Sequence, residues 1–150
     1  MNAVIQRVME ANVEVDGKII SKIGKGLLIL LCVCVDDEEE DATILARKIA
    51  YLRIFDDDKG KFNHSVVDIN GEVLLVSEFT LAANIRKGSR PDFLHAAGKE
   101  EAIKLMDLFR ETLHSLIKKP VSTGKFAAHM IVNIKNDGPV TLFMDSKDLW

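Results

Sequence analysis

The ten-residue stretch GLLILLCVCV, residues 26–35, decides how the chain is expected to fold. It is apolar at every position after its glycine, so it does not alternate between an apolar and a polar face. Such a strand is buried on both faces, because a strand with one solvated face carries polar residues at every second position. The stretch is too short to cross a membrane as a helix, which takes about 20 residues. We therefore expect it to be a central strand of a sheet.

Shorter strands and two helices are predicted on either side of this central strand. Residues 3–9 form a strand and residues 13–23 a hairpin, since apolar positions flank Asp16-Gly17, the usual pair for a tight turn. The six acids Asp36–Asp41 open a helix, where carboxylates favour the positive end of the dipole, and apolar spacing carries it to about Arg53. The remaining elements are a strand over 72–81, a helix over 98–118, and strands over 129–135 and 140–145.

Strands outnumber helices in this order, and the two do not alternate regularly. The sequence therefore predicts a single α/β domain over residues 1–150, with a mixed or antiparallel, partly closed, barrel-like sheet covered by two helices. The length fits one domain, and an apolar content of 47% is enough for one packed core. Residues 147–150 form a short tail for which the sequence offers no role.

Composition limits the partners and the location of the protein. The formal net charge is -3, so contact with RNA has to use a local basic patch. Cys32 and Cys34 stand two apart on the central strand, and we expect two small buried thiols in the core without a disulfide or a metal. The first residues contain no long apolar segment of a signal peptide, so a cytoplasmic protein without a membrane span is expected.

Conventional catalytic motifs are missing from the sequence. It has no Gly-x-Ser-x-Gly, no His-Glu-x-x-His and no phosphate-binding glycine loop. The four histidines lack the spacing of metal ligands, and only His129, close to a motif described below, is a candidate for a role. We therefore expect no metal, no cofactor and no conventional catalytic triad.

Two short segments carry the functional hypothesis. Residues 77–81, Ser-Glu-Phe-Thr-Leu, are either an ordinary strand end or a place where backbone N–H groups and the Thr80 hydroxyl face a ligand. Residues 136–141, Asn-Asp-Gly-Pro-Val-Thr, are either a hairpin turn or a rigid bend with a cis bond before Pro139. Composition does not decide between these alternatives.

Both segments resemble the signature motifs of D-aminoacyl-tRNA deacylases, Ser-Gln-Phe-Thr-Leu and Asn-x-Gly-Pro-Val-Thr. Supporting segments follow in the same order: residues 4–8, residues 52–55, Lys87-Gly88 with Pro91, and residues 124–126 leading to Met130. The resemblance covers about residues 1–146. It implies a homodimeric hydrolase, without a cofactor, that acts on aminoacylated tRNA. Its substrates would be D-aminoacyl-tRNA and glycyl-tRNA, including glycine mischarged on tRNA-Ala.

The same resemblance implies roles for individual residues. Gly138 and Pro139 would form a cis bond that reaches into the partner's active site, and Arg7 would hold this bend. The pocket of the other subunit would be lined by Ser77, Phe79, Thr80, Leu81 and Met130. Position 78 departs from the family, which usually has Gln there. Glu78 either points outward as a tolerated exchange or puts a carboxylate near the pocket.

The mechanism expected from these residues needs no triad. An aminoacyl ester is an activated bond, so positioning and oxyanion stabilisation suffice for its hydrolysis. Backbone N–H groups near Phe79 and Thr80 would hold the carbonyl while water attacks, helped, as the family implies, by the 2′-hydroxyl of the terminal adenosine. Thr80 as a covalent nucleophile is the alternative. Gly138-Pro139 would exclude L side chains as a rigid wall and accept hydrogen bonds from the substrate ammonium.

The tRNA is expected to be held through its phosphates by Arg86, Lys87 and Arg90, unless these residues form only a solvated basic loop. Two rival functions are a nucleic-acid-binding module without hydrolase activity and an interaction protein that uses its dimer surface. The acidic balance and the presence of only one Trp and one Tyr argue against the first.

Overall fold

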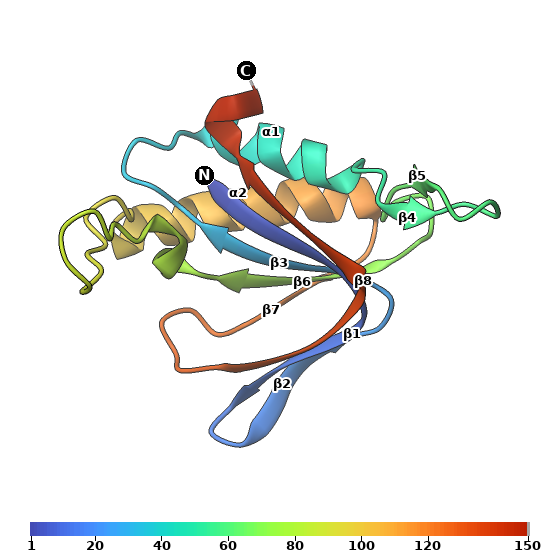
Figure 1. The fold of residues 1–150 in the computed structure, drawn as a ribbon, viewed down its shortest axis with the longest axis horizontal. Coiled ribbons are helices and arrows are strands. Elements are labelled where there is room, and N and C mark those ends of the chain that lie inside the picture. The colour runs from blue at the N-terminus through green and yellow to red at the C-terminus, as the bar shows by residue number, and fades with distance from the viewer. Residues whose placement is uncertain (150) are drawn as a thin grey trace.

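The computed structural model describes residues 1–149 and shows two helices packed against one face of a curved sheet (Figure 1). The strands are β1 (Asn2–Val15), β2 (Lys18–Ile23), β3 (Gly26–Cys32), β4 (Phe55–Asp56), β5 (Phe62–His64), β6 (Glu72–Ser77), β7 (Val121–Thr123) and β8 (Ile131–Asp145). The helices are α1 (Glu39–Ala50) and α2 (Lys99–Ile117), with the short 3-10 helices η1 (Phe79–Ala82) and η2 (Ser146–Leu149). Within residues 1–149, no helix combines the length and apolar character needed to span a membrane.

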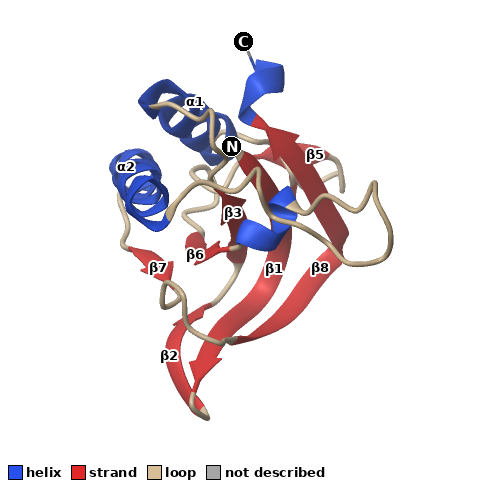
Figure 2. Cartoon of the chain, turned by 90° about the vertical axis from the view of Figure 1, so that its left-hand side faces the viewer, coloured by secondary structure: helices blue, strands red, loops and turns tan. Residues whose placement is uncertain are grey.

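The main sheet has six strands in the order β2-β1-β3-β6-β7, and β8 pairs with β1. β1 is antiparallel to β2, β3 and β8, whereas the pairs β3–β6 and β6–β7 are parallel. The sheet curls into a nearly closed barrel, and α1 and α2 lie side by side over one of its faces (Figure 1, Figure 2). The predicted fold class, a mixed and partly closed sheet covered by two helices, is confirmed.

β1 is the strand along which most of the sheet is arranged. β3 pairs with its first half, from Asn2 to Val8, and β2 pairs with its second half, from Ala11 to Val15. β8 runs beside both halves (Figure 2). The predicted break after residue 9 is therefore wrong, because β8 bridges the two halves through bulges. The hairpin turn is confirmed: Asp16 and Gly17 have φ angles of 51° and 74°, as a tight turn of this type requires.

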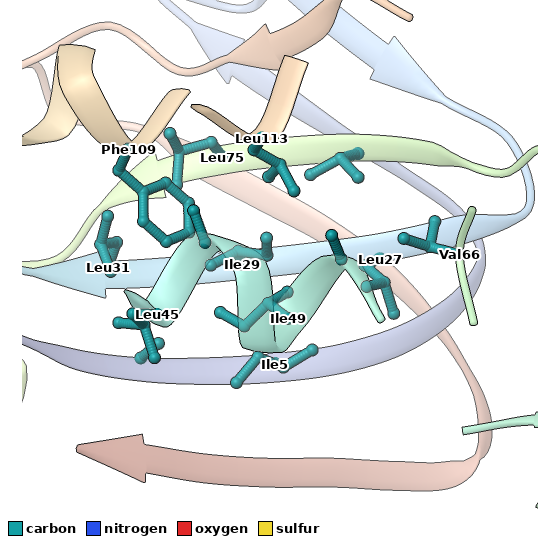
Figure 3. Packing of buried hydrophobic residues seen from close by; sticks show 14 of the residues in the cluster. Ile5, Leu27, Ile29, Leu31, Leu45, Ile49, Val66, Leu75, Phe109 and Leu113 are labelled. Atoms are coloured by element: carbon teal, nitrogen blue, oxygen red, sulfur yellow. The ribbon is translucent and has the colours of Figure 1, made fainter. Parts of the chain in front are cut away.

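β3 is buried on both faces, as its composition predicts. One face, which includes Leu27, packs against Leu45 of α1 and Phe109 of α2 (Figure 3). The other face joins a second apolar cluster made of Val8, Ala11, Val13, Ile23, Leu28, Leu74 and Val76. β3 and β6 also approach closely where they begin, since a Cβ atom at Gly26 would lie 1.8 Å from the carbonyl oxygen of Glu72. A glycine is therefore required at the start of the central strand.

Several boundaries differ from the predicted ones for local reasons. β3 ends at Cys32 instead of Val35, because the Cys34 N–H donates to the Asp37 carboxylate at 2.6 Å and leaves the ladder. β6 ends at Ser77, and the segment expected to extend the strand forms η1. The helix predicted from the acidic run begins only at Glu39 and ends at Ala50.

The segment that contains the second motif is also different from a hairpin. β8 is one strand over residues 131–145, so the prediction of two strands joined by a turn is wrong. Its register against β1 shifts between Gln6 and Val8, and residues 137–140 form the bulge there. β4, β5 and β7 were not predicted, because strands of two or three residues are too short to show a periodic pattern.

A buried polar cluster joins the end of β8 to the start of α1. The Asp41 carboxylate accepts hydrogen bonds from the Glu38 N–H at 2.8 Å, the Ser146 hydroxyl at 2.7 Å and the Lys147 ammonium at 2.6 Å. Burial raises the pKa of Asp41, but the bonds from Lys147, the Glu38 backbone and Ser146 outweigh it and lower the pKa to about 2. Lys147, in the tail to which the sequence assigned no role, therefore fastens α1. Trp150 lies outside the described residues.

This cluster predicts a pH-dependent contribution to stability. A carboxyl with a lowered pKa stabilises the fold above its unfolded pKa of about 3.9, and this contribution is lost as the pH falls toward about 2. Replacing Lys147 by Met should lower the free energy of unfolding by about 2 kcal/mol at pH 7, and by progressively less between pH values of about 4 and 2.

Urea unfolding at several pH values measures this difference. Lys104→Met is the control, because Lys104 forms a solvent-exposed ion pair with Glu39 at 2.9 Å and should change stability by less than about 1 kcal/mol. A loss for Lys147→Met that stays constant down to the acid limit would show that the Asp41 charge is not what Lys147 stabilises.

Candidate active site

A cavity of about 550 Å3 opens where β3 and β6 end. Its size is typical of sites for small ligands. The walls come from the end of β6 with η1, the start of α2 and the loop between β7 and β8. Four residues of the predicted site line it, namely Ser77, Glu78, Phe79 and Met130. Further lining residues include Cys32, Lys99, Met106, Phe126 and His129.

η1 forms because the chain leaves the sheet directly after β6. The Glu78 N–H makes the last bond to β3, to the Leu31 carbonyl at 2.9 Å, and the backbone then turns into a 3-10 helix. The first N–H groups of a helix have no partner within it. Among residues 1–149, the N–H groups of Phe79 and Thr80 have no hydrogen-bond acceptor. Two consecutive main-chain donors are therefore unpaired beside the cavity.

The side chains next to these donors make one hydrogen bond and one aromatic contact. The Thr80 hydroxyl donates to the Glu78 carboxylate, and within residues 1–149 it has no hydrogen bond to a histidine. Glu78 lines the cavity, which favours the alternative of a carboxylate near the pocket over an outward-pointing exchange. Phe79 is 56% exposed, and its ring meets Phe93 edge-on at 5.0 Å. Thr80 and Leu81 lie in η1 beyond the cavity lining.

Met130 reaches the cavity because of a glycine on the neighbouring loop. A Cβ atom at Gly124 would lie 2.7 Å from the Met130 sulfur, so a larger residue there would displace the Met130 side chain. Phe126 and His129 from the same loop also line the cavity. His129 was the one histidine considered for a role from the sequence.

The two cysteines are free thiols; Cys32 is buried, as expected, whereas Cys34 is only half-buried. A hydrogen bond with Cys34, together with burial, raises the pKa of the Cys32 thiol far above its usual range. Cys32 lines the cavity but stays protonated at neutral pH, so it is not a nucleophile there. Within residues 1–149, no cluster of three or more His, Cys, Asp or Glu side chains is arranged to bind a metal.

Arg7 holds the segment before Gly138. Its Nε donates to the Asp137 carbonyl at 2.8 Å, and one terminal nitrogen donates to the Ile54 carbonyl at 2.8 Å. The guanidinium also pairs with Asp56 at 3.2 Å, and only 6% of Arg7 is exposed. The peptide bond between Gly138 and Pro139 is cis, as the resemblance implies. Both residues are exposed and line none of the described cavities.

Gly138-Pro139 and the cavity lie at opposite ends of the sheet. Arg7 pairs with Leu27 at the start of β3, whereas Ser77 pairs with Leu31 near its end. Four residues along a strand correspond to about 13 Å. In Figure 1, η1 and the loop after it lie on one side of the molecule. The β4–β5 hairpin lies on the other side, and β8 bends next to this hairpin. One chain therefore does not bring its two motifs together.

The predicted tRNA-binding loop lies outside the cavity. Arg86 lines a separate hollow of about 440 Å3 with Ile85 and His95, and Lys87 and Arg90 are exposed. Sequence reasoning missed Lys99, the lysine that lines the main cavity. No motif marks it, because only the fold brings the start of α2 next to β3.

Comparison with known proteins identifies the family. The family model for D-Tyr-tRNA(Tyr) deacylase matches residues 4–145. A D-aminoacyl-tRNA deacylase of Persephonella marina is 56% identical over 99% of this chain and 100% of its own length. That of Thermosipho melanesiensis is 53% identical over the full length of both chains.

Two solved structures are also similar. One, described as the c-Myc DNA unwinding element binding protein, has a TM-score of 0.91 and 41% identity, covering 97% of this chain and 98% of that chain. The other, described as a probable eukaryotic D-amino acid tRNA deacylase, has a TM-score of 0.82 over 95% of this chain and 97% of that chain. At 15% identity, the second structure shares the fold.

These matches settle the class and then the family of the protein. The chain is an enzyme of the hydrolase class. It belongs to the D-Tyr-tRNA(Tyr) deacylase family, whose model covers nearly its whole length.

The contacts of Arg7 predict a large effect of its removal. Arg7→Met leaves the carbonyls of Asp137 and Ile54 without their donor. Because hydrogen bonds to charged groups contribute roughly 1.5–3 kcal/mol each, the free energy of unfolding should fall by about 3 kcal/mol. Urea unfolding measures the change. Arg110→Met, which removes an exposed pair with Glu111, should cost less than about 1 kcal/mol. Equal losses would contradict the anchoring role of Arg7.

Proposed function

We propose that this protein hydrolyses the ester that joins a D-amino acid to the 3′ end of tRNA and rejects the L form. The observation that carries the proposal is the pair of unpaired N–H groups of Phe79 and Thr80 beside a cavity of suitable size. Such donors stabilise the negative charge that develops on a carbonyl oxygen during ester hydrolysis.

The reaction proceeds by direct attack of water on the ester carbonyl. The water oxygen bonds to the carbonyl carbon, and the carbonyl oxygen takes on negative charge that the Phe79 and Thr80 N–H groups stabilise. The bond to the ribose oxygen then breaks, and this oxygen leaves with a proton from the water. The 2′-hydroxyl of the terminal adenosine assists the proton transfer. The products are a free D-amino acid and tRNA with its terminal hydroxyl restored.

A homodimer supplies the missing half of the site. The offset of about 13 Å along β3 between the register positions of the two motifs in one chain favours an arrangement in which Gly138-Pro139 of one subunit enters the cavity of the other. β8 pairs only with β1 within residues 1–149, and along this edge strand Ile131, Ile134 and Phe143 are exposed. A long edge strand with exposed apolar residues is normally covered by another segment or another chain, and a second subunit would provide this cover.

Gly138-Pro139 selects against L-amino acids by exclusion. D and L forms carry the same groups, so attractive contacts with the side chain discriminate poorly, whereas a rigid main-chain wall adds a repulsive contact for one form only. The Gly138 and Pro139 carbonyls accept hydrogen bonds from the substrate ammonium, which is common to all substrates. Glycine has no side chain to exclude, so glycyl-tRNA, including glycine mischarged on tRNA-Ala, is also a substrate.

The rest of the tRNA is held through its phosphates. Arg86, Lys87 and Arg90 are exposed on the loop that follows η1 and contact the RNA outside the cavity. We place the protein in the cytoplasm, where its substrate occurs.

DNA binding is a second candidate function, favoured by the description of the solved structure that shares 41% identity. Against it, the chain carries a net charge of -3, whereas binding along a duplex relies on many basic contacts. Incubation with D-tyrosyl-tRNA and L-tyrosyl-tRNA separates the two functions. Selective release of D-tyrosine supports the deacylase, and release of neither form, with retained binding of duplex DNA, would overturn it.

Thr80 distinguishes catalysis by the main chain from catalysis by a covalent nucleophile. Thr80→Ala keeps the N–H group and removes the hydroxyl, so we expect single-turnover rates with D-tyrosyl-tRNA within about tenfold of wild type. A loss on the order of 10⁴-fold, rescued by Thr80→Ser, would instead assign the hydroxyl as the nucleophile.

A further inference from the structure

We infer that Lys99 is a substrate-positioning residue that binds the phosphodiester next to the terminal adenosine of the tRNA. The inference rests on the proposed function, because it concerns the same cavity. It adds a residue that neither motif contains.

Lys99 is held at the cavity by the sheet. It is the first residue of α2 and lines the cavity. The segment before it is tied to the end of β3, since the Ala97 N–H donates to the Val33 carbonyl at 2.9 Å and Ala96 pairs with Cys34. β3 is the neighbour of β6, which leads to the unpaired donors of η1. Lys99 and Phe79, the first residue of η1, therefore line the same cavity.

The charge of Lys99 is not used within the fold. Among residues 1–149 it forms no ion pair, and the Glu78 carboxylate of the same cavity is not bound to it. Lys104, five residues later on α2, is by contrast paired with Glu39 at 2.9 Å and with Glu101 at 3.9 Å. An unpaired ammonium at the rim of a ligand cavity favours an anionic group of the ligand.

The start of α2 supports the same assignment. Its N-cap is Gly98, whose lack of a side chain leaves the first N–H groups without a side-chain cap. These N–H groups and the helix dipole favour an anion. Glu100 and Glu101 lie in the same turn and oppose this effect, so Lys99 is the group on which the binding depends.

The substrate has opposite charges on its two sides. The amino acid carries an ammonium, and the nucleotide that carries the ester is joined to the preceding one by a phosphodiester. The cavity has a carboxylate, Glu78, next to η1 and an ammonium, Lys99, at the start of α2. This pattern matches the substrate when the ester lies at η1 and the phosphodiester at Lys99, and it disfavours the reversed orientation.

Two pairs of ligands test the inference. Cytidylyl-adenosine contains one phosphodiester, and adenosine contains none. Binding is measured with the two free compounds. Hydrolysis is measured with the D-tyrosyl ester of each compound. Lys99→Ala should weaken binding of cytidylyl-adenosine about tenfold and raise the KM of its ester by a similar factor with kcat nearly unchanged. Binding and hydrolysis of the adenosine compounds should not change.

The controls make the role specific to the phosphate. Lys104→Ala, on the same helix, should leave all four measurements unchanged, and Lys99→Arg should retain most of the wild-type affinity. With full D-tyrosyl-tRNA, the slope of log(kcat/KM) against log salt should decrease by about 0.7 for Lys99→Ala, the value for one lost phosphate contact on a single strand.

Other outcomes overturn the inference. An equal loss with adenosine and with cytidylyl-adenosine would show that Lys99 shapes the cavity without contacting a phosphate. Wild-type protein that binds both compounds equally would show that no phosphodiester is recognised there. Because binding is measured without hydrolysis, wild-type protein that binds cytidylyl-adenosine through Lys99 but hydrolyses neither ester would overturn the proposed function alone.

Discussion

The pairing of β1 with β8 fixes the distance between the two motifs and so determines what one chain can do. Arg7 on β1 binds the main chain of β8 at Asp137 and also the Ile54 carbonyl. Gly138-Pro139 is thereby held at the start of β3, while η1 projects from the end of β6. Because β3 is buried on both faces and Arg7 ties β8 to β1 at Asp137, neither motif can slide toward the other. A site that uses both motifs has to be assembled from two chains.

The reaction proposed for this site needs few catalytic groups, and the site contains few. An aminoacyl ester hydrolyses with less assistance than an amide, so in the proposed mechanism two main-chain donors and a positioned water take the place of a triad. Because these donors bind the ester carbonyl, catalysis in the proposed mechanism does not depend on the side chain of the substrate's amino acid. In the proposed mechanism, selectivity depends on exclusion of the L side chain by the exposed Gly138-Pro139 segment of the partner subunit. In the orientation inferred above, Lys99 and Glu78 position the substrate and take no part in bond cleavage.

Much of this architecture was predictable from local patterns. The uniform apolarity of β3 indicated burial on both faces, the Asp16-Gly17 pair indicated a hairpin, and the spacing of α2 indicated its extent. The motifs indicated the family, because two of them occur in the right order. These signals are local in sequence, and each expresses a physical requirement at a few neighbouring positions.

Other features depend on contacts between distant residues and have no local signal. β8 is continuous only because β1 pairs with both of its halves, although Gly and Pro normally end a strand. Lys99 reaches the cavity only through the attachment of Ala97 to β3. The tail has its role only through the contact of Lys147 with Asp41, over a hundred positions earlier. Cys32, assigned to the core, also lines the cavity because β3 ends there.

A complementation experiment between two inactive variants addresses the two-chain site directly. Ala128→Trp fills the cavity, and Gly138→Ala displaces the bend, since a Cβ atom there would lie 2.5 Å from the Val140 nitrogen. When the two are unfolded together and refolded, random pairing makes half of the dimers mixed. One of the two sites in each mixed dimer combines an intact cavity with an intact bend, so about a quarter of wild-type D-tyrosyl-tRNA hydrolysis should return. If the mixture stays as inactive as its components although mixed dimers form, the site lies within one chain and the account is wrong.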